Sequence, residues 1–152
     1  MTPQFEPAQL EDAEALLSLQ RSAYASEAAL YPGMVIPPIA DDLAEMRAAI
    51  ARGVVYKLVE QRALLGSVRA ELKNRHWEIG PLVVWPELQR RGLGRRLMAE
   101  AEALAPAGLT IKLFTGRLSE NNLTFYRQLG YRESGRQTLT PQLNLIWLSK
   151  VV

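Results

Sequence analysis

Cysteine is absent from the 152 residues of this chain, and histidine occurs only once, as His76. Without cysteine, the chain cannot build a disulfide framework, thiolate metal ligands, an iron–sulfur cluster or a cysteine nucleophile. A single histidine is too few for a histidine-rich metal site. We therefore expect no metal, and a chemistry that does not pass through a cysteine-bound intermediate.

Long apolar runs are also missing. No stretch of about 18 uncharged apolar residues occurs, so we expect no membrane-spanning segment and no membrane partner. The first residues lack the basic start and apolar run of a signal peptide, which favours a cytoplasmic protein. With 48% apolar and 22% charged residues, the composition is globular, and the length predicts one domain over residues 1–152.

The periodicity of apolar residues predicts an α/β protein with a mixed, mostly antiparallel central sheet and helices on both faces. Pro81 cannot donate a ladder hydrogen bond, so its strand must be bulged, splayed or at an edge there. The apolar, proline-rich segment 31–38 is interpreted equally well as a lid or as a loop packed on the core. The predicted elements are helices over 8–24 and 42–52, strands over 54–60, 64–72 and 76–84, a helix from 93 that ends before Pro106, a strand over 109–115, a helix over 119–129, and strands over 131–137 and 142–149.

The strongest chemical signal lies where the strand that ends at Val84 passes through a loop into the next helix. This loop reads Gln89-Arg90-Arg91-Gly92-Leu93-Gly94-Arg95-Arg96. Glycines let backbone amides approach a ligand closely, and a helix start presents unpaired N–H groups with a partial positive charge. The pattern predicts a phosphate or pyrophosphate site surrounded by four arginines. A glycine-containing turn with solvated arginines is the plainer interpretation.

Two motifs together resemble the Gcn5-related N-acetyltransferase (GNAT) superfamily. Gln89-x-x-Gly92-x-Gly94 is similar to its Q/R-x-x-G-x-G/A signature, and it follows a Val-x-Pro strand end. Residues 122–131, Asn-Leu-Thr-Phe-Tyr-Arg-Gln-Leu-Gly-Tyr, look like its second signature, in which a helix runs into Tyr-x-x-x-Gly-Phe/Tyr. The resemblance covers nearly the whole chain in element order. It implies a GNAT-like sheet that is splayed at the strand before the glycine-rich loop.

The resemblance also implies that acetyl-CoA is the cosubstrate, with its pyrophosphate on the loop. The preceding strand end, Leu82, Val83 and Val84, would hydrogen-bond the pantetheine and orient the thioester carbonyl. The family often has an asparagine seven residues before its tyrosine. Here Ser119 occupies that position, so Asn122 is predicted as the displaced polar contact. The loop residues implied to bind the cofactor are Gln89, Arg90, Arg91, Gly92, Leu93, Gly94, Arg95 and Arg96.

Tyr126 and Glu78 are the predicted catalytic residues. Tyr126 matches the family tyrosine that protonates the departing CoA thiolate, and a phenol with an ordinary pKa near 10 is protonated at neutral pH. Glu78 lies four residues before Leu82, the position of the glutamate base in the histone-acetylating branch of the family. Strand alternation is expected to place it on the same side as His76, Leu82 and Val84. His76 or a water is an alternative base, and both predicted residues could instead be ordinary structural side chains.

Helical spacing groups the residues around Tyr126 into two stripes. Ser119, Asn122 and Tyr126 fall at i, i+3 and i+7, which predicts a polar stripe. An apolar stripe that faces the core is predicted beside it. Its members are Leu118, Phe125 and Leu129.

These residues predict an acetyl-CoA-dependent N-acetyltransferase that acts on a primary amine by direct attack in a ternary complex. The acceptor would be a small-molecule or peptide amine, with segments 31–39 and 138–141 as its pocket walls. A noncatalytic acyl-CoA-binding sensor on the same fold is the alternative. A nucleic-acid partner is not expected, because aromatic interleaving and a second basic stripe are missing. A homodimer is compatible with the resemblance, because dimers are common in the family.

Overall fold

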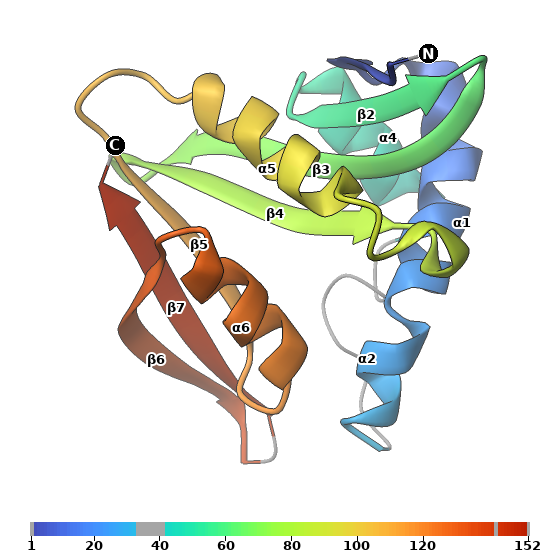
Figure 1. Cartoon of the computed structure of the whole chain (residues 1–152). Coiled ribbons are helices and arrows are strands. Elements are labelled where there is room, and N and C mark those ends of the chain that lie inside the picture. The colour runs from blue at the N-terminus through green and yellow to red at the C-terminus, as the bar shows by residue number, and fades with distance from the viewer. Residues whose placement is uncertain (1, 33–41, 142, 152) are drawn as a thin grey trace.

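The computed structural model describes residues 2–32, 42–141 and 143–151 (Figure 1). Most of segment 31–38, for which a lid was one prediction, lies outside the described residues. Within them, every helix is too short or too polar to span a membrane. The elements are β1 (Gln4–Pro7), a 3-10 turn (Leu10–Asp12), α1 (Ala13–Ala23), α2 (Ala25–Ala29), α4 (Leu43–Ala51), β2 (Val55–Glu60), β3 (Ala63–Lys73), β4 (His76–Val84), a second 3-10 turn (Pro86–Leu88), α5 (Leu93–Ala103), β5 (Thr110–Gly116), α6 (Glu120–Gln128), β6 (Arg132–Thr140) and β7 (Leu143–Val151).

The strands of the described residues form one seven-stranded sheet in the order β1-β2-β3-β4-β5-β7-β6. Every neighbouring pair is antiparallel except β4 and β5, which run parallel. This parallel pairing consists of only two residue pairs, Trp77 with Ile111 and Glu78 with Lys112. Beyond them the two strands diverge, and the sheet opens into a V (Figure 1). The predicted mixed, mostly antiparallel sheet and its splay before the glycine-rich loop are confirmed.

Helices cover both faces of the sheet, also as predicted. α5 crosses the face of β3 and β4, and α6 lies over β5 and β7 on the same side (Figure 1). Leu97, Met98 and Leu123 from these two helices share a core with sheet residues. On the other face, Leu16 of α1 and Met46 of α4 belong to a second core. Each amphipathic helix therefore buries its apolar side against the sheet. The burial of each large apolar side chain stabilises the fold by roughly 2 kcal/mol.

Several helices and strands begin or end where local sequence signals predict. The side chain of Asp42 accepts a hydrogen bond from the N–H of Glu45 at 2.8 Å, and so it caps the start of α4. Gln61 and Arg62 both have positive φ, 51° and 70°, and form the tight turn between β2 and β3. α2 was not predicted. Its sequence Ala-Ser-Glu-Ala-Ala favours a helix by propensity but has no apolar periodicity to reveal it.

β4 contains a bulge at Pro81. Ala70 of β3 pairs with Ile79 of β4, and Val68 pairs with Leu82. These two pairs are three residues apart along β4 but only two apart along β3, so β4 carries one extra residue. Gly80, beside Pro81, has φ +126°, a conformation that side-chain-bearing residues rarely adopt. The sequence-based expectation of an irregularity at Pro81 is confirmed.

The bulge reverses the alternation of side chains along β4. Leu82 and Val84 contribute to the core under α5, whereas Val83 belongs to the core under α1 and α4. Counted through the pairing with β3, Glu78 shares the face of Val83. The expectation that Glu78 points to the same side as Leu82 and Val84 was wrong, because strict alternation does not hold across an extra residue. His76 and Glu78 do lie on one side, as predicted.

Candidate active site

A groove of about 620 Å³ opens between α5 and α6, beside the last residues of β4. The splay of the sheet leaves this edge of β4 without pairing to β5 beyond Glu78. Backbone N–H and C=O groups on such an edge are available to a bound molecule, as on an edge strand. The groove brings together nine of the predicted cofactor-binding residues, Leu82, Val84, Gln89, Arg90, Gly92, Leu93, Gly94, Arg95 and Asn122.

The start of α5 forms one end of this groove. Gly92 is the residue that precedes the helix, with φ +82° and no side-chain cap. A Cβ at this position would meet no atom within 4 Å, so glycine is required here by its backbone conformation and not by space. The first amides of an α-helix have no acceptor within the helix and point outward with the positive end of its dipole. The groove therefore ends in a site suited to an anion.

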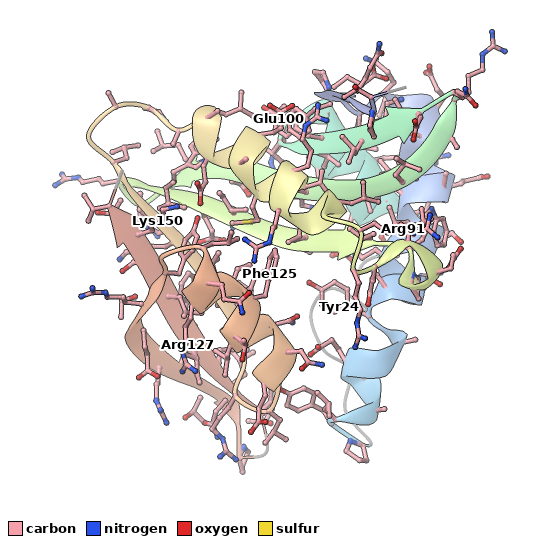
Figure 2. The ribbon with its side chains drawn as sticks, viewed as in Figure 1. Tyr24, Arg91, Glu100, Phe125, Arg127 and Lys150 are labelled. Carbon is pink, nitrogen blue, oxygen red and sulfur yellow. The ribbon has the colours of Figure 1, made fainter. Side chains whose placement is uncertain are left out.

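The four arginines of the loop lie in different surroundings. Arg90 and Arg95 line the groove, and Arg95 donates a hydrogen bond from Nη2 to Oε1 of Gln128 on α6 at 3.2 Å. Arg96 pairs with Glu100 one turn along α5, at 3.3 Å. Arg91 is exposed on the loop (Figure 2). The positive charge nearest the groove thus comes from Arg90 and Arg95 together with the helix start.

Tyr126 lies on α6 next to Phe125, which lines the groove, but Tyr126 itself is not among the lining residues. Its ring is partly buried and packs against the rings of Phe125 and Tyr131, with centroids 5.2 and 6.1 Å apart. Burial, and then the nearby carboxylate of Glu27, raise the pKa of Tyr126 well above its usual range. The phenol is therefore a hydrogen-bond donor at any physiological pH.

The predicted stripes of this helix are confirmed only in part. Ser119, which is 2% exposed, and Asn122 both reach the same partner, the carboxylate of Glu27. Leu118 is 41% exposed and does not belong to the core, so its place in the apolar stripe was wrong. Leu118 lies before the N-cap residue of α6, outside the helix, so helical spacing does not apply to it. Leu123 is the buried residue of α6 instead.

Three residues between the end of α1 and the segment that follows α2 complete this region and were missed from the sequence. Glu27 accepts a hydrogen bond from Asn122 Nδ2 at 3.3 Å and one from the hydroxyl of Ser119. The hydroxyl of Tyr31 accepts from the N–H of Leu118 at 3.1 Å. Tyr24 lies at the junction of α1 and α2 (Figure 2). No motif marks these residues, and they lie about ninety positions from their partners in the chain.

The pKa of Tyr24 is also raised far above its usual range. Burial is the main cause, followed by Tyr126 and by the carboxylate of Glu27, while Arg69 acts in the opposite direction. Tyr24 and Tyr126 come from opposite faces of the sheet and influence each other through the opening of the V. The hydrogen bonds of Glu27 bring α2 against the start of α6 at the gap between β4 and β5.

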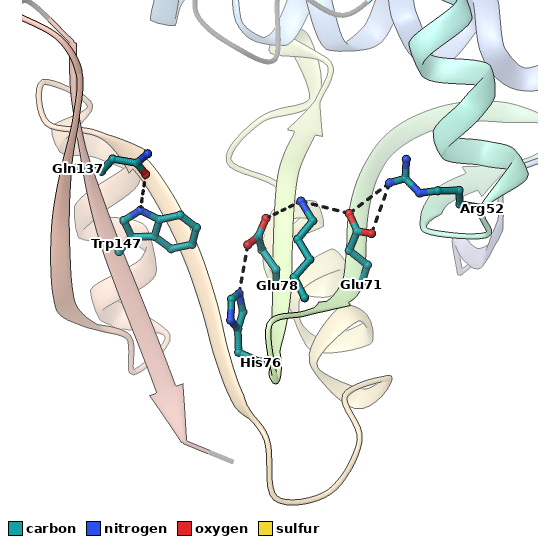
Figure 3. A network of polar contacts seen from close by, with 7 residues as sticks. Arg52, Glu71, His76, Glu78, Gln137 and Trp147 are labelled. Carbon is teal, nitrogen blue, oxygen red and sulfur yellow. Dashed lines mark hydrogen bonds and ion pairs between the residues drawn. The ribbon is translucent and has the colours of Figure 1, made fainter.

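Glu78 occupies a different place, at the closed end of the V. Its carboxylate lies 3.2 Å from Nε2 of His76 and 3.3 Å from Nζ of Lys73, and its side chain is 13% exposed (Figure 3). Lys73 is shared with Glu71, which also pairs with Arg52. Glu78, His76 and Lys112 line a second pocket of about 410 Å³ together with residues of β6 and Trp147. The structure does not bring Glu78 into the groove that contains the glycine-rich loop.

Comparison with known families settles the class of protein. The model of the acetyltransferase (GNAT) domain matches residues 51–133, which is more than half of the chain. The chain belongs to this family. Both predicted signatures, around Gly92 and around Tyr126, fall inside the matched segment of the GNAT domain. Tyr24, Glu27 and Tyr31 precede it.

Solved structures share the GNAT fold over nearly the full length of the chain. PaiA N-acetyltransferase from Thermoplasma acidophilum, in complex with coenzyme A, is 16% identical, with a TM-score of 0.73 over 97% of this chain and 98% of that one. YncA, a putative acetyltransferase from Salmonella typhimurium with acetyl-CoA, is also 16% identical, with a TM-score of 0.73 over 99% and 94%. The ribosomal-protein-S18-alanine N-acetyltransferase from Escherichia coli is 16% identical, with a TM-score of 0.66 over 97% and 92%. No curated protein sequence matches this GNAT chain.

Proposed function

We propose that this chain is an acetyl-CoA-dependent N-acetyltransferase that acetylates a primary amine, of a small molecule or a peptide, in a ternary complex. The observation that carries the proposal is the groove, in which a glycine-led helix start and two arginines adjoin a strand edge that has separated from its neighbour. Family membership supports it, as do the relatives crystallised with coenzyme A or acetyl-CoA. The cysteine-free sequence is consistent with direct transfer and with a cytoplasmic setting. From the length of the chain we also infer one domain over residues 1–152.

The residues present fit acetyl-CoA. The amides at the start of α5, from Leu93 onward, would bind the pyrophosphate, with Arg90 and Arg95 closest and Arg91 and Arg96 farther out. The free edge of β4 at residues 82–84 would hydrogen-bond the pantetheine arm. Gln89 and Asn122 are polar residues on the groove wall, and each would add a contact to the arm or the phosphates.

In the proposed reaction, acetyl-CoA supplies a thioester, and the chain orients it. The deprotonated amine attacks the carbonyl carbon, the new C–N bond forms, and the C–S bond breaks as the sulfur leaves with the electron pair. The nitrogen then loses its second proton to become the amide, and this proton replaces the one that Tyr126 gives to sulfur. Tyr126 holds its proton tightly, and a phenol with a raised pKa gives it to a thiolate only at a cost, because a thiol has a pKa near 8.5. Tyr126 therefore acts first as a hydrogen-bond donor that stabilises the developing charge on sulfur, and the proton follows as CoA leaves as the thiol.

Glu78 is the proposed acceptor of the proton that the amine loses, directly or through a water. It is the carboxylate at the point where β4 and β5 separate, and it faces a polar pocket on the side away from α5. His76 lies within hydrogen-bond distance of it and could pass the proton onward. An acceptor that enters from this side would meet the thioester from the side opposite the groove.

The experiment is a panel of primary amines, assayed for CoA release with a thiol reagent, together with calorimetric titration of acetyl-CoA. The wild type should bind acetyl-CoA and release CoA with at least one amine. Tyr126→Phe should keep the Kd for acetyl-CoA within about twofold and lower kcat about 100-fold, the usual range for a lost general acid. Tyr56→Phe is the matched control, because Tyr56 stacks on Phe5 away from the groove.

Each alternative gives a different result. Binding of acetyl-CoA without CoA release for any amine, and an unaltered Tyr126→Phe variant, would identify a noncatalytic acyl-CoA sensor. An absence of acetyl-CoA binding would disprove both the N-acetyltransferase and the acyl-CoA sensor. Tight, strongly salt-dependent binding to DNA or RNA would point instead to the arginines as a nucleic-acid surface.

A further inference from the structure

Glu27 of α2 carries a negative charge that no described basic residue neutralises. One carboxylate oxygen accepts a hydrogen bond from Asn122 Nδ2 at 3.3 Å, and the other accepts from the hydroxyl of Ser119. Both donors are neutral. Among residues 2–32, 42–141 and 143–151, no lysine, arginine or histidine lies within ion-pair distance of it. Glu27 is partly buried, and burial makes a charge without a counter-ion costlier.

The other partly buried carboxylates near the V differ in this respect. Glu78 is paired with Lys73 at 3.3 Å. Glu102, which accepts a hydrogen bond from Tyr131, is paired with Lys150 at 3.2 Å. Glu27 alone among these three is held only by neutral donors. Its place in the fold is therefore one where a cation from outside the chain would complete the charge balance.

Glu27 is also connected to the groove through Asn122. Asn122, one of its two donors, lines the groove and donates a second hydrogen bond, to Thr115 of β5 at 3.3 Å. Ser119 is buried and lies 3.4 Å from the hydroxyl of Tyr31. The carboxylate thus stands in the opening of the V, where α2 meets α6. After burial, the charge of Glu27 is a further cause that raises the pKa of Tyr24 and of Tyr126.

We propose that Glu27 binds the protonated amine of the acceptor at the open end of the V, and that this chain therefore selects cationic aliphatic amines over neutral arylamines. The assignment rests on the proposed function. An ammonium group offers three donors and full charge, so its hydrogen bond to a carboxylate is about twice as strong as one between neutral groups. Glu27 takes no proton in this assignment. The bound ammonium loses its proton to the base described above before it attacks.

The test compares two isomeric acceptors, benzylamine, which is protonated at neutral pH, and 4-methylaniline, which is neutral. The variants are Glu27→Gln, which keeps the shape and one acceptor oxygen, and Glu27→Asp, which keeps the charge. Glu14→Gln, an exposed glutamate on α1, is the matched control. The readouts are kcat/KM for each amine, the Kd for acetyl-CoA and the melting temperature.

The wild type should prefer benzylamine, even though only a small fraction of it is the free, reactive amine at neutral pH. Glu27→Gln should lower kcat/KM for benzylamine at least tenfold while it changes the value for 4-methylaniline and the Kd for acetyl-CoA less than twofold. Glu27→Asp should retain most of the preference, and Glu14→Gln should match the wild type.

A Glu27→Gln variant that loses activity equally toward both amines, or toward neither, would overturn the assignment and leave the proposed function standing. A wild type that prefers 4-methylaniline would also overturn the assignment. This measurement needs no variant, so it still decides the question if the Glu27→Gln protein does not fold. If the wild type binds acetyl-CoA but acetylates no amine, the proposed function falls and this assignment falls with it.

Discussion

The hydroxyl of Tyr31 occupies the space that a side chain on Gly116 would need. Tyr31 is 4% exposed, and a Cβ built on Gly116 would overlap its oxygen. The same hydroxyl accepts a hydrogen bond from the N–H of Leu118, and Ser119 Oγ lies 3.4 Å away. Gly116 ends β5, so this contact fixes the segment that follows α2 against the segment that leads into α6.

Gly116→Ala should therefore displace Tyr31 and destabilise the protein. Overpacking of this kind costs about 1–3 kcal/mol, and the loss of the Tyr31 hydrogen bonds adds to it. Gly135→Ala is the control, because a Cβ there meets nothing within 4 Å and no unusual φ is involved. Urea denaturation of both variants measures the free energy of unfolding. Equal values for the two would show that Tyr31 can move aside without cost.

Gly92→Ala should weaken acetyl-CoA binding through backbone conformation alone. Its φ of +82° costs an alanine about 1–2 kcal/mol, which corresponds to roughly a tenfold rise in Kd if the loop must hold that shape to bind. Gly53→Ala carries the same strain, with φ +76° and no neighbour within 4 Å, but lies at the end of α4. Calorimetry should find an unchanged Kd for Gly53→Ala. A similar Kd in both variants would remove the loop from the binding site.

Local signals explain why one half of this site could be predicted from the sequence. The glycines and arginines of the loop and the spacing of α6 act within a few residues of one another, so their placement follows from helix starts and helical periodicity. Family resemblance then added roles to those residues. The orientation of Glu78 could not be predicted, because Pro81 indicated an irregularity but not that it inserts one residue and exchanges the two faces.

The other half depends on contacts between distant parts of the chain. Glu27 meets Ser119 and Asn122 across more than ninety residues, and it does so only because the V between β4 and β5 lets α2 approach α6. A glutamate in a short alanine-rich segment gives no sign of such a partner. Its missing counter-cation is visible only once the neighbours from all packed elements are known.

Alkaline pH should unfold this protein with an unusually steep dependence on pH. The pKa values of Tyr24, Tyr126 and Tyr131 are all raised by burial, and that of Tyr131 also by its hydrogen bond to Glu102. Above pH 10 these tyrosines ionise in the unfolded chain but stay protonated in the folded one, so the free energy of unfolding falls as pH rises. The stabilisation is fully present below pH 10.

For each such tyrosine the free energy of unfolding falls by about 1.4 kcal/mol per pH unit above 10. For three tyrosines together the loss approaches about 4 kcal/mol per pH unit. Thermal melts from pH 8 to 11.5, combined with the ultraviolet absorbance of tyrosinate, measure both effects. Tyr24, Tyr126 and Tyr131 should ionise together with unfolding and not before it. Ionisation of Tyr24, Tyr126 and Tyr131 near pH 10 in the folded protein would contradict their buried positions.

Glu78→Gln tests the proposed proton acceptor. If Glu78 takes the proton of the amine, kcat at pH 7 should fall about 100-fold, within the range for general bases, while the Kd for acetyl-CoA stays unchanged. The difference in kcat between the wild type and the variant should become smaller as pH rises, because a larger fraction of the acceptor amine then binds already deprotonated. Steady-state kinetics from pH 6.5 to 9.5 with one aliphatic amine measure this.

Glu71→Gln is the matched control for that variant. Glu71 belongs to the same polar network, paired with Lys73 at 3.5 Å and Arg52 at 3.4 Å, but it does not line the pocket that Glu78 faces. It should keep kcat within about twofold, since its loss leaves Lys73 paired with Glu78. Equal losses in the two variants, without any narrowing at high pH, would show that the network only holds the β3–β4 hairpin in place. An unaffected Glu78→Gln variant would transfer the role of base to His76 or to a water.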